Sequence, residues 1–161
     1  MKGVILQVSV SPGGLPKRPV PQAFLTPLGF KGDAVAHPDI HGGPRKAVLL
    51  VTGEAIGELV ARGYPLFPGA LGENLTTRGL ERRDLRVGMR LRAGEAILEL
   101  TRLRVPCASL DVYGPSLKSE IFRKEMTPAD ADWGLSGFYA SVVETGWVRA
   151  NDIIWVVDAA V

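Results

Sequence analysis

Cysteine and histidine are nearly absent from this chain of 161 residues, which has Cys107 and two histidines. One cysteine cannot form an internal disulfide, an iron–sulfur cluster or a cysteine-rich zinc site. His37 and His41 have a spacing that binds zinc only on a helix, and Pro38 and the glycines after His41 disfavour a helix there. We therefore exclude a histidine-based zinc site. A single thiol fits a reducing compartment, and we expect a cytoplasmic protein.

Long apolar runs and a strong net charge are absent as well. No stretch approaches the roughly 20 apolar residues that span a bilayer, and the apolar run at the N-terminus is too short for a signal peptide. The formal net charge of +2 is too small to favour nucleic acid or an anionic membrane as a partner. Hydrophobic residues make up 46% of the chain, as in ordinary globular proteins. We expect a single domain over residues 1–161 that binds neither nucleic acid nor membrane.

Asparagine and glutamine are scarce as well. The chain has 12 prolines, and 13 of its 19 basic residues are arginine. Such a composition is typical of a heat-stable protein. A GC-rich genome would produce the same excess of arginine, so thermophily is one of two interpretations.

Short apolar runs separated by glycine make up most of the chain. β-Branched residues alternate over Gly3–Val10, and the apolar run Ala47–Thr52 is typical of a fully buried strand. Further predicted strands follow at Leu85–Val87, Met89–Leu91, Ile97–Leu103, Phe138–Glu144 and Ile153–Val157. This pattern predicts a mainly β fold, with a closed or nearly closed antiparallel β-barrel.

A few segments differ from this strand pattern. Four apolar residues fall on one face of Glu54–Arg62, and Gly63 suits the position just after a helix. A second helix is predicted over Ser116–Lys124. The segment Ser11–Pro21 holds four prolines and two glycines, which predict a loop or an edge segment. We expect the helices to pack outside the barrel.

Cys107 ends the sequence Arg104-Val-Pro-Cys, which follows a predicted strand over Ala96–Arg104. Pro106 has no N–H for a strand ladder, so the strand should stop there and present the thiol beyond its end. Because Arg104 adds a positive charge three residues before Cys107, a thiolate is favoured, and thiolates bind soft metals. The alternative is that Cys107 is a small buried hydrophobic residue.

A second candidate site begins at His41 and continues to Lys46. Gly42 and Gly43 let the backbone approach a ligand closely and expose its N–H groups. Arg45 and Lys46 add positive charge, so the segment could bind a phosphate or another anion. The alternative is a Gly-Pro turn that leads into the next strand.

The third candidate is Gly72-Glu73-Asn74, where a carboxylate and an amide follow a glycine. Such side chains could hydrogen-bond the edge of a heterocycle, although a capped turn would need the same residues. Tyr139, in a late strand, could line a pocket or belong to the core. No Walker loop, dinucleotide fingerprint or Gly-x-Ser-x-Gly elbow is present, and no nucleophile helix surrounds Cys107.

Taken in order, these motifs resemble the MOSC domain, the family related to the C-terminal domain of molybdenum cofactor sulfurase. The motifs are His41–Lys46, Gly72–Leu75, Gly88 before a strand, Arg104–Cys107, Gly137–Tyr139 and Asn151–Ile153. The likeness covers about Gly29 to Val157 and is greatest to the small stand-alone bacterial members. It implies one MOSC domain with a barrel of the MOSC and pyruvate-kinase-barrel type, and a molybdopterin-type molybdenum cofactor.

The resemblance also implies where the cofactor would bind. Cys107 would be the catalytic residue, as the molybdenum ligand or as a carrier of sulfur. Arg104 and Lys46 would meet the cofactor's phosphate, together with the amides of Gly42 and Gly43.

The remaining family positions would complete the cofactor site. Glu73 and Asn74, next to Gly72, would face the pterin. Tyr139 would line the pocket, and His41 would contribute from its loop.

The implied activity is reduction of a small N-hydroxylated or N-oxide substrate. An external electron-donor protein would then be needed, because the chain has no flavin, haem or iron–sulfur motif. The alternative is a non-redox carrier of the cofactor, or of persulfide sulfur that a donor protein places on Cys107. Larger members have an extra N-terminal barrel domain for which this chain has no room. The Gly32-Asp33 segment and the proline-rich segment before it, or a partner, would have to complete the pocket.

Overall fold

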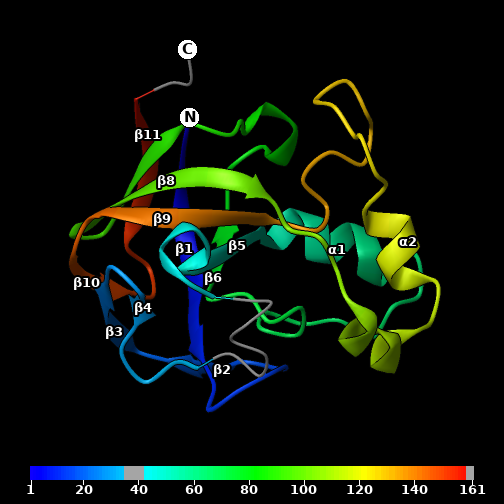
Figure 1. Cartoon of the computed structure of the whole chain (residues 1–161), viewed down its shortest axis with the longest axis horizontal. Coiled ribbons are helices and arrows are strands. Elements are labelled where there is room, and N and C mark those ends of the chain that lie inside the picture. Colours follow the sequence, from blue (N-terminus) through cyan, green and yellow to red (C-terminus); the bar gives the residue numbers. More distant parts are fainter. Residues whose placement is uncertain (35–41, 159–161) are drawn as a thin grey trace.

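Seven strands close into a barrel in the computed structural model, which describes residues 1–34 and 42–158 (Figure 1). Around the ring the strands are β1 (Lys2–Val10), β11 (Ile153–Asp158), β7 (Arg90–Ala93), β8 (Ala96–Leu103), β9 (Phe138–Glu144), β5 (Val48–Thr52) and β6 (Leu75–Arg78), which returns to β1. β2 (Arg18–Val20) adds to β1 beside the ring. A separate small sheet consists of β10 (Gly146–Arg149), β3 (Gln22–Thr26) and β4 (Gly29–Phe30). The predicted mainly β fold with a closed barrel is confirmed.

One strand pair of the ring differs from the expected antiparallel arrangement. β5 and β6 run parallel, with Leu50 opposite Leu75, whereas the other neighbours in the ring are antiparallel. Parallel neighbours require a crossover connection. The helix α1 (Gly53–Ala61) begins directly after β5 and supplies that crossover.

β5 is buried on both faces, as its sequence predicts. Val48 and Leu50 point into the barrel core, where they join side chains of the other strands. Leu49 and Val51 face the opposite way and pack in a second cluster with Leu59 of α1. A strand between two apolar layers needs no polar alternation, which explains its uninterrupted apolar sequence.

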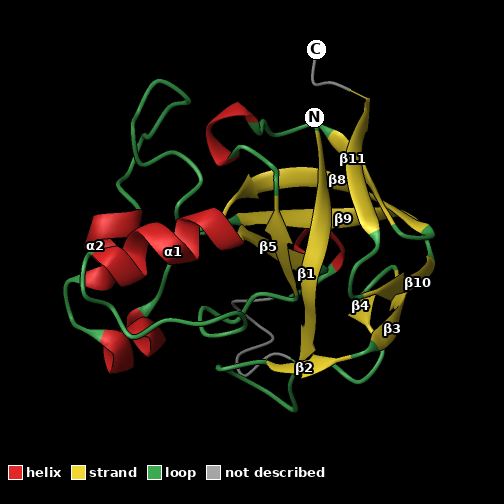
Figure 2. Cartoon of the chain, turned by 180° about the vertical axis from the view of Figure 1, so that it is seen from behind, coloured by secondary structure: helices red, strands yellow, loops and turns green. Residues whose placement is uncertain are grey.

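Helices cover one side of the barrel, and the small sheet lies on the other side (Figure 2). Thr52 caps the N-terminus of α1, and its hydroxyl accepts a hydrogen bond from the Ala55 N–H at 3.1 Å. The helix predicted over Ser116–Lys124 is shorter, because α2 (Leu117–Ile121) ends where Phe122 adopts an extended conformation. Within residues 1–34 and 42–158, the short 3-10 helices are η1 (Pro44–Lys46), η2 (Arg82–Asp84) and η3 (Ala108–Tyr113). In the described part of the chain, no helix has the length and apolar character to cross a membrane.

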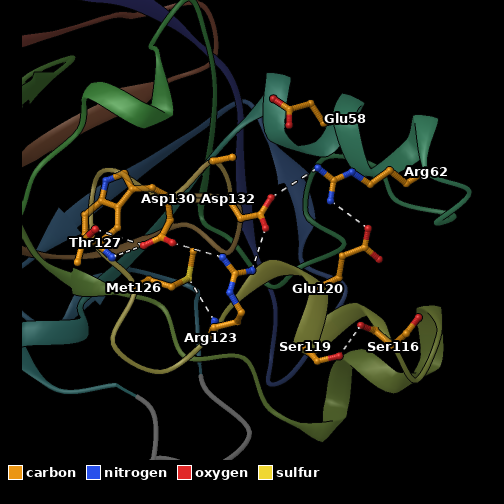
Figure 3. Close-up of polar contacts among 12 residues, drawn as sticks. Glu58, Arg62, Ser116, Ser119, Glu120, Arg123, Met126, Thr127, Asp130 and Asp132 are labelled. Atoms are coloured by element: carbon orange, nitrogen blue, oxygen red, sulfur yellow. Dashed lines mark hydrogen bonds and ion pairs between the residues drawn. The ribbon is translucent and has the colours of Figure 1, made fainter.

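An ion-pair network connects α1, α2 and the loop after α2 (Figure 3). Arg62 lies between two carboxylates, with 3.0 Å from its Nη1 to Glu120 Oε1 and 3.7 Å from its Nη2 to Asp132 Oδ1. On its other side, Asp132 accepts a 2.9 Å bond from Arg123. The network therefore adds polar links between α1 and α2, whose side chains Leu59, Leu117 and Ile121 already share a buried apolar cluster.

We expect Glu120→Gln to lower the free energy of unfolding slightly at pH 7 and not at pH 3. A hydrogen bond from Tyr64 and the ion pair with Arg62 hold the pKa of Glu120 below its usual value. A carboxylate with a lowered folded-state pKa stabilises the fold above its unfolded pKa and loses this effect as the pH falls through the folded one. Because the pair is partly exposed, the loss should be at most about 1 kcal/mol. Urea unfolding at both pH values measures it, and an equal difference at both would contradict the ionic origin.

Candidate functional site

A cavity of about 340 Å³ lies against β5 and β9, within the size range of small-molecule sites. Its walls come from distant parts of the sequence: the proline-rich segment around Leu15 and Lys17, the turn from Leu28 to Ala34, the segment from Gly42 to Leu49, the loop Leu71–Asn74, and the chain after β8 with Arg104 and Cys107. The fold thus brings the three candidate motifs to one place.

Most of the predicted site residues line this cavity, namely Gly42, Gly43, Lys46, Gly72, Asn74, Arg104, Cys107 and Tyr139. His41 lies outside the described residues. Among the described ones, Glu73 is the exception, because it is completely buried and is not part of the cavity wall. Its carboxylate instead accepts bonds from the N–H groups of Gly69 and Leu71 and from the Thr76 hydroxyl, so the structure does not place it toward a ligand.

Cys107 is half-buried at the cavity wall, just before η3. Its Sγ lies 2.8 Å from the Ser109 hydroxyl. Partial burial raises the pKa of the Cys107 thiol, but hydrogen bonds from Ser109 and the charge of Arg104 outweigh this effect, so the pKa lies below its ordinary value. The alternative of a sealed hydrophobic cysteine does not hold, because the thiol borders the cavity.

Arg104 is only 5% exposed, and its guanidinium is incompletely bonded. Nη2 donates to the Leu71 carbonyl at 2.9 Å, while Nε and Nη1 have no hydrogen-bond partner among the described residues. Burial lowers the pKa of Arg104, and the nearby Tyr139, Cys107 and Glu73 act in the opposite direction. An unsatisfied buried donor costs about 1–3 kcal/mol. An anion in the cavity would remove that cost.

Lys46 is positioned by the turn that precedes it. Gly42 and Gly43 have φ angles of 93° and 89°, a region that glycine enters without strain. They lead into η1, whose last residue is Lys46. The Lys46 ammonium lies 5.5 Å from the ring centroid of Tyr139, within the range of a cation–π contact. Burial raises the pKa of Tyr139, against the influence of Arg104.

The structure adds a buried ion pair that sequence reasoning missed. Lys17 Nζ contacts Asp33 Oδ1 at 2.5 Å, and the two side chains are 7% and 10% exposed. The Gly32-Asp33 turn was expected at the pocket, but nothing in the proline-rich segment singles out Lys17. Both residues line the cavity, so these two N-terminal segments do form part of its wall.

The side-chain amide of Asn74 connects three segments of the chain through hydrogen bonds. Its Oδ1 accepts from the Leu49 N–H at 3.1 Å, and its Nδ2 donates to the Ser9 carbonyl at 3.2 Å and to Asp33 at 2.8 Å. Both amide protons are therefore used within the protein. Asn74 borders the cavity, yet its bonds hold the wall and leave little capacity to bind a heterocycle.

The family model of the MOSC domain matches residues 37–155, and the chain belongs to the MOSC domain family. The particular relatives include an uncharacterized protein, YflK, of Bacillus subtilis, 35% identical over 139 residues, which are 84% of this chain and 59% of that protein. Protein YiiM of Escherichia coli is 36% identical over 97 residues, which are 57% of this chain and 43% of YiiM. The chain thus spans about half the length of these curated relatives.

Solved structures show the same architecture. The crystal structure of YiiM from Geobacillus stearothermophilus has a TM-score of 0.75 at 25% identity, covering 97% of this chain and 75% of that one. YiiM from Escherichia coli has a TM-score of 0.74 at 25% identity, covering 99% and 71%. The chain therefore shares its overall fold with these YiiM structures.

We expect Ser109→Ala to raise the pKa of Cys107, because the substitution removes the hydroxyl that stabilises the thiolate. The rate of alkylation by iodoacetamide against pH reports this directly, since no other cysteine competes. Ser119→Ala, on the exposed side of α2, is the matched control and should leave the profile unchanged. A profile that does not move in Ser109→Ala would show that the hydroxyl has no influence on the thiol.

Proposed function

We propose that this cavity binds a molybdopterin-type molybdenum cofactor and that the protein is a small oxidoreductase for N-hydroxylated or N-oxide substrates. The MOSC domain is generally associated with molybdenum cofactor binding. One observation carries the proposal for this chain: the guanidinium of Arg104 is buried with two unpartnered nitrogens in the same cavity as the Cys107 thiol. An anionic group suits the first and a soft metal suits the second.

The donor set of the cavity fits such a cofactor. Cys107, with its lowered pKa, would be the protein ligand to molybdenum. Arg104 and Lys46 would hold the phosphate, beside the backbone of Gly42 and Gly43. When bound, the cofactor would supply the two-electron chemistry that removes oxygen from nitrogen.

The chain's own residues would orient the ligands and set the local charge. Among the described residues that line the cavity, Lys17, Lys46 and Arg104 are basic and Asp33 is acidic. Lys17 pairs with Asp33, and Lys46 and Arg104 bring further positive charge to the wall. This charge favours an anionic cofactor, and apolar side chains such as Leu49 and Leu71 would contact a flat ring.

An electron-donor protein is part of the proposal, since one cysteine cannot hold an iron–sulfur cluster of the chain's own. We also propose a cytoplasmic location, where a reducing environment keeps Cys107 as a thiol.

A second candidate function is a carrier of the cofactor or of sulfur. It is favoured by the accessibility and lowered pKa of Cys107, the two properties that persulfide formation requires. A sulfur-donor protein would then be the partner. Protein from a host that makes the cofactor separates the two functions: an oxidoreductase retains molybdenum in a 1:1 ratio, whereas a sulfur carrier shows a persulfide mass gain on Cys107 without metal.

Cys107→Ser should abolish most molybdenum retention and most reduction of N-hydroxylated compounds. Serine has nearly the same volume but offers a hard, poorly ionised oxygen, so the melting temperature should change little. Elemental analysis and turnover with a reduced donor measure both effects. A Cys107→Ser protein with full molybdenum and full turnover would rule out the ligand role.

Lys46→Ala should weaken cofactor affinity by about 1–3 kcal/mol, the value of one hydrogen bond to a charged group. Arg45→Ala is the matched control, because Arg45 lies in the same turn but is exposed and does not line the cavity. The rate of cofactor release under dilution compares the two variants. Equal release from both would remove Lys46 from the site.

A further inference from the structure

We propose that Glu73 is a positioning residue for the anion site: its carboxylate fixes the backbone of Leu71, and the Leu71 carbonyl in turn orients the guanidinium of Arg104. The inference rests on the proposed function in one respect, namely that Arg104 meets an anionic ligand. It gives a role to Glu73, the one described residue of the predicted site that does not line the cavity.

The Glu73 carboxylate is occupied entirely by the protein. Oε1 accepts from the Leu71 N–H at 3.1 Å. Oε2 accepts from the Gly69 N–H at 3.0 Å and from the Thr76 hydroxyl at 2.9 Å. The side chain is completely buried. A buried carboxylate with three donors around it holds the loop from Gly69 to Leu71 in one conformation.

Leu71 connects this carboxylate to the arginine. Its N–H bonds to Glu73, and its carbonyl accepts the 2.9 Å bond from Arg104 Nη2. That bond is the one hydrogen bond that the guanidinium makes among the described residues, so the position of the Leu71 carbonyl determines where Nε and Nη1 point. A shift of the loop would therefore turn the arginine.

The indirect connection leaves two guanidinium nitrogens of Arg104 without a partner among the described residues. A direct bidentate pair with Glu73 would occupy the nitrogens that an anion needs. Here the carboxylate still favours the buried guanidinium through its charge, while Nε and Nη1 keep no partner among the described residues. Burial raises the pKa of Glu73 above its ordinary value; hydrogen bonds from Gly69 and Thr76 and, to a smaller extent, the charge of Arg104 act in the opposite direction.

The loop cannot easily relax if Glu73 is changed. Gly69 has a φ of 94°, and a Cβ atom there would meet the Lys17 carbonyl oxygen at 2.2 Å. The Lys17 N–H donates to the Gly69 carbonyl at 2.9 Å. The start of the loop is thus fixed against the N-terminal segment, and a change at Glu73 should act on the other end, at Leu71.

Glu73→Gln tests the inference because glutamine supplies one acceptor atom where the site presents donors on both sides. In either orientation of the amide its NH2 group faces a backbone N–H, that of Leu71 or that of Gly69, so the loop from Gly69 to Leu71 must move. Inorganic phosphate is the probe, titrated calorimetrically into the full chain from a host that makes no molybdenum cofactor. The phosphate affinity should fall about tenfold, as expected for a misplaced charge-assisted hydrogen bond.

Thr76→Val is the matched control. It removes one of the three donors to Glu73 and should lower the melting temperature, but it leaves the bond to Leu71 intact. Its phosphate affinity should equal that of the wild type. If Glu73→Gln loses no more affinity than Thr76→Val, Glu73 is merely structural and the inference is overturned.

Two further variants keep the outcomes separate. Arg104→Gln should abolish the phosphate binding seen in the wild type. If it does not, the anion site of the proposed function is wrong, and the role of Glu73 is lost with it. If Glu73→Gln does not fold, Glu73→Asp retains the acceptors but is too short to reach all three donors. Its phosphate affinity should fall likewise, and an unchanged value would overturn the inference.

Discussion

Arg104 brings a permanent positive charge into a place from which water is largely excluded, and the surrounding residues are arranged around that charge. The chain holds the arginine backbone on both sides, through the Gly137 carbonyl at 2.9 Å and the Ser136 hydroxyl at 2.7 Å. These two bonds fix the backbone from which the buried guanidinium extends. Within the described part of the chain, the fold leaves two nitrogens of this guanidinium without a hydrogen-bond partner, a feature that is typical of ligand-binding sites.

Side-chain hydrogen bonds and an ion pair, more than helices and strands, hold the segments of the cavity wall in place. Asn74 joins Ser9, Leu49 and Asp33, which lie on or next to three different strands. Asp33 and Lys17 lie before residue 37, where the match to the family model begins. The part of the chain with no family signal thus supplies one wall of a cavity whose other walls are typical of the family.

The sequence predicted those features that local periodicity encodes. The strand Phe138–Glu144 has the predicted bounds, and α1 lies within one residue of its predicted bounds, because alternation and a one-sided apolar face are local properties. The parallel pairing of β5 with β6 was not predicted, because a strand that is buried on both faces has the same apolar sequence in a parallel and in an antiparallel pair. Cys107 and Arg104 were identified as neighbours of one cavity. The effect of the Arg104 charge on the Cys107 thiol can be inferred from the four-residue motif Arg104-Val-Pro-Cys107 alone.

Other site features depend on contacts that no local pattern records. Glu73 was expected to face a ligand, but a carboxylate in a glycine-containing loop can equally satisfy N–H groups of that loop, and here it does. The pairing of Lys17 with Asp33 joins two irregular segments, so no periodicity connects them. Only the tertiary structure determines which polar side chains are hydrogen-bonded within the protein and which are available to a ligand.

The closure of the ring has a kinetic consequence. β1 pairs with β11 from Lys2 opposite Trp155 to Val4 opposite Ile153, so the barrel is completed by segments about 150 residues apart. Bringing such distant segments together has a large loop-closure entropy, and proteins rich in such contacts fold slowly. The β8–β9 and β7–β8 pairs join nearer segments and can form earlier. Until β11 meets β1, the edge of β1 is open to strands of other copies, so aggregation during refolding should compete at this edge.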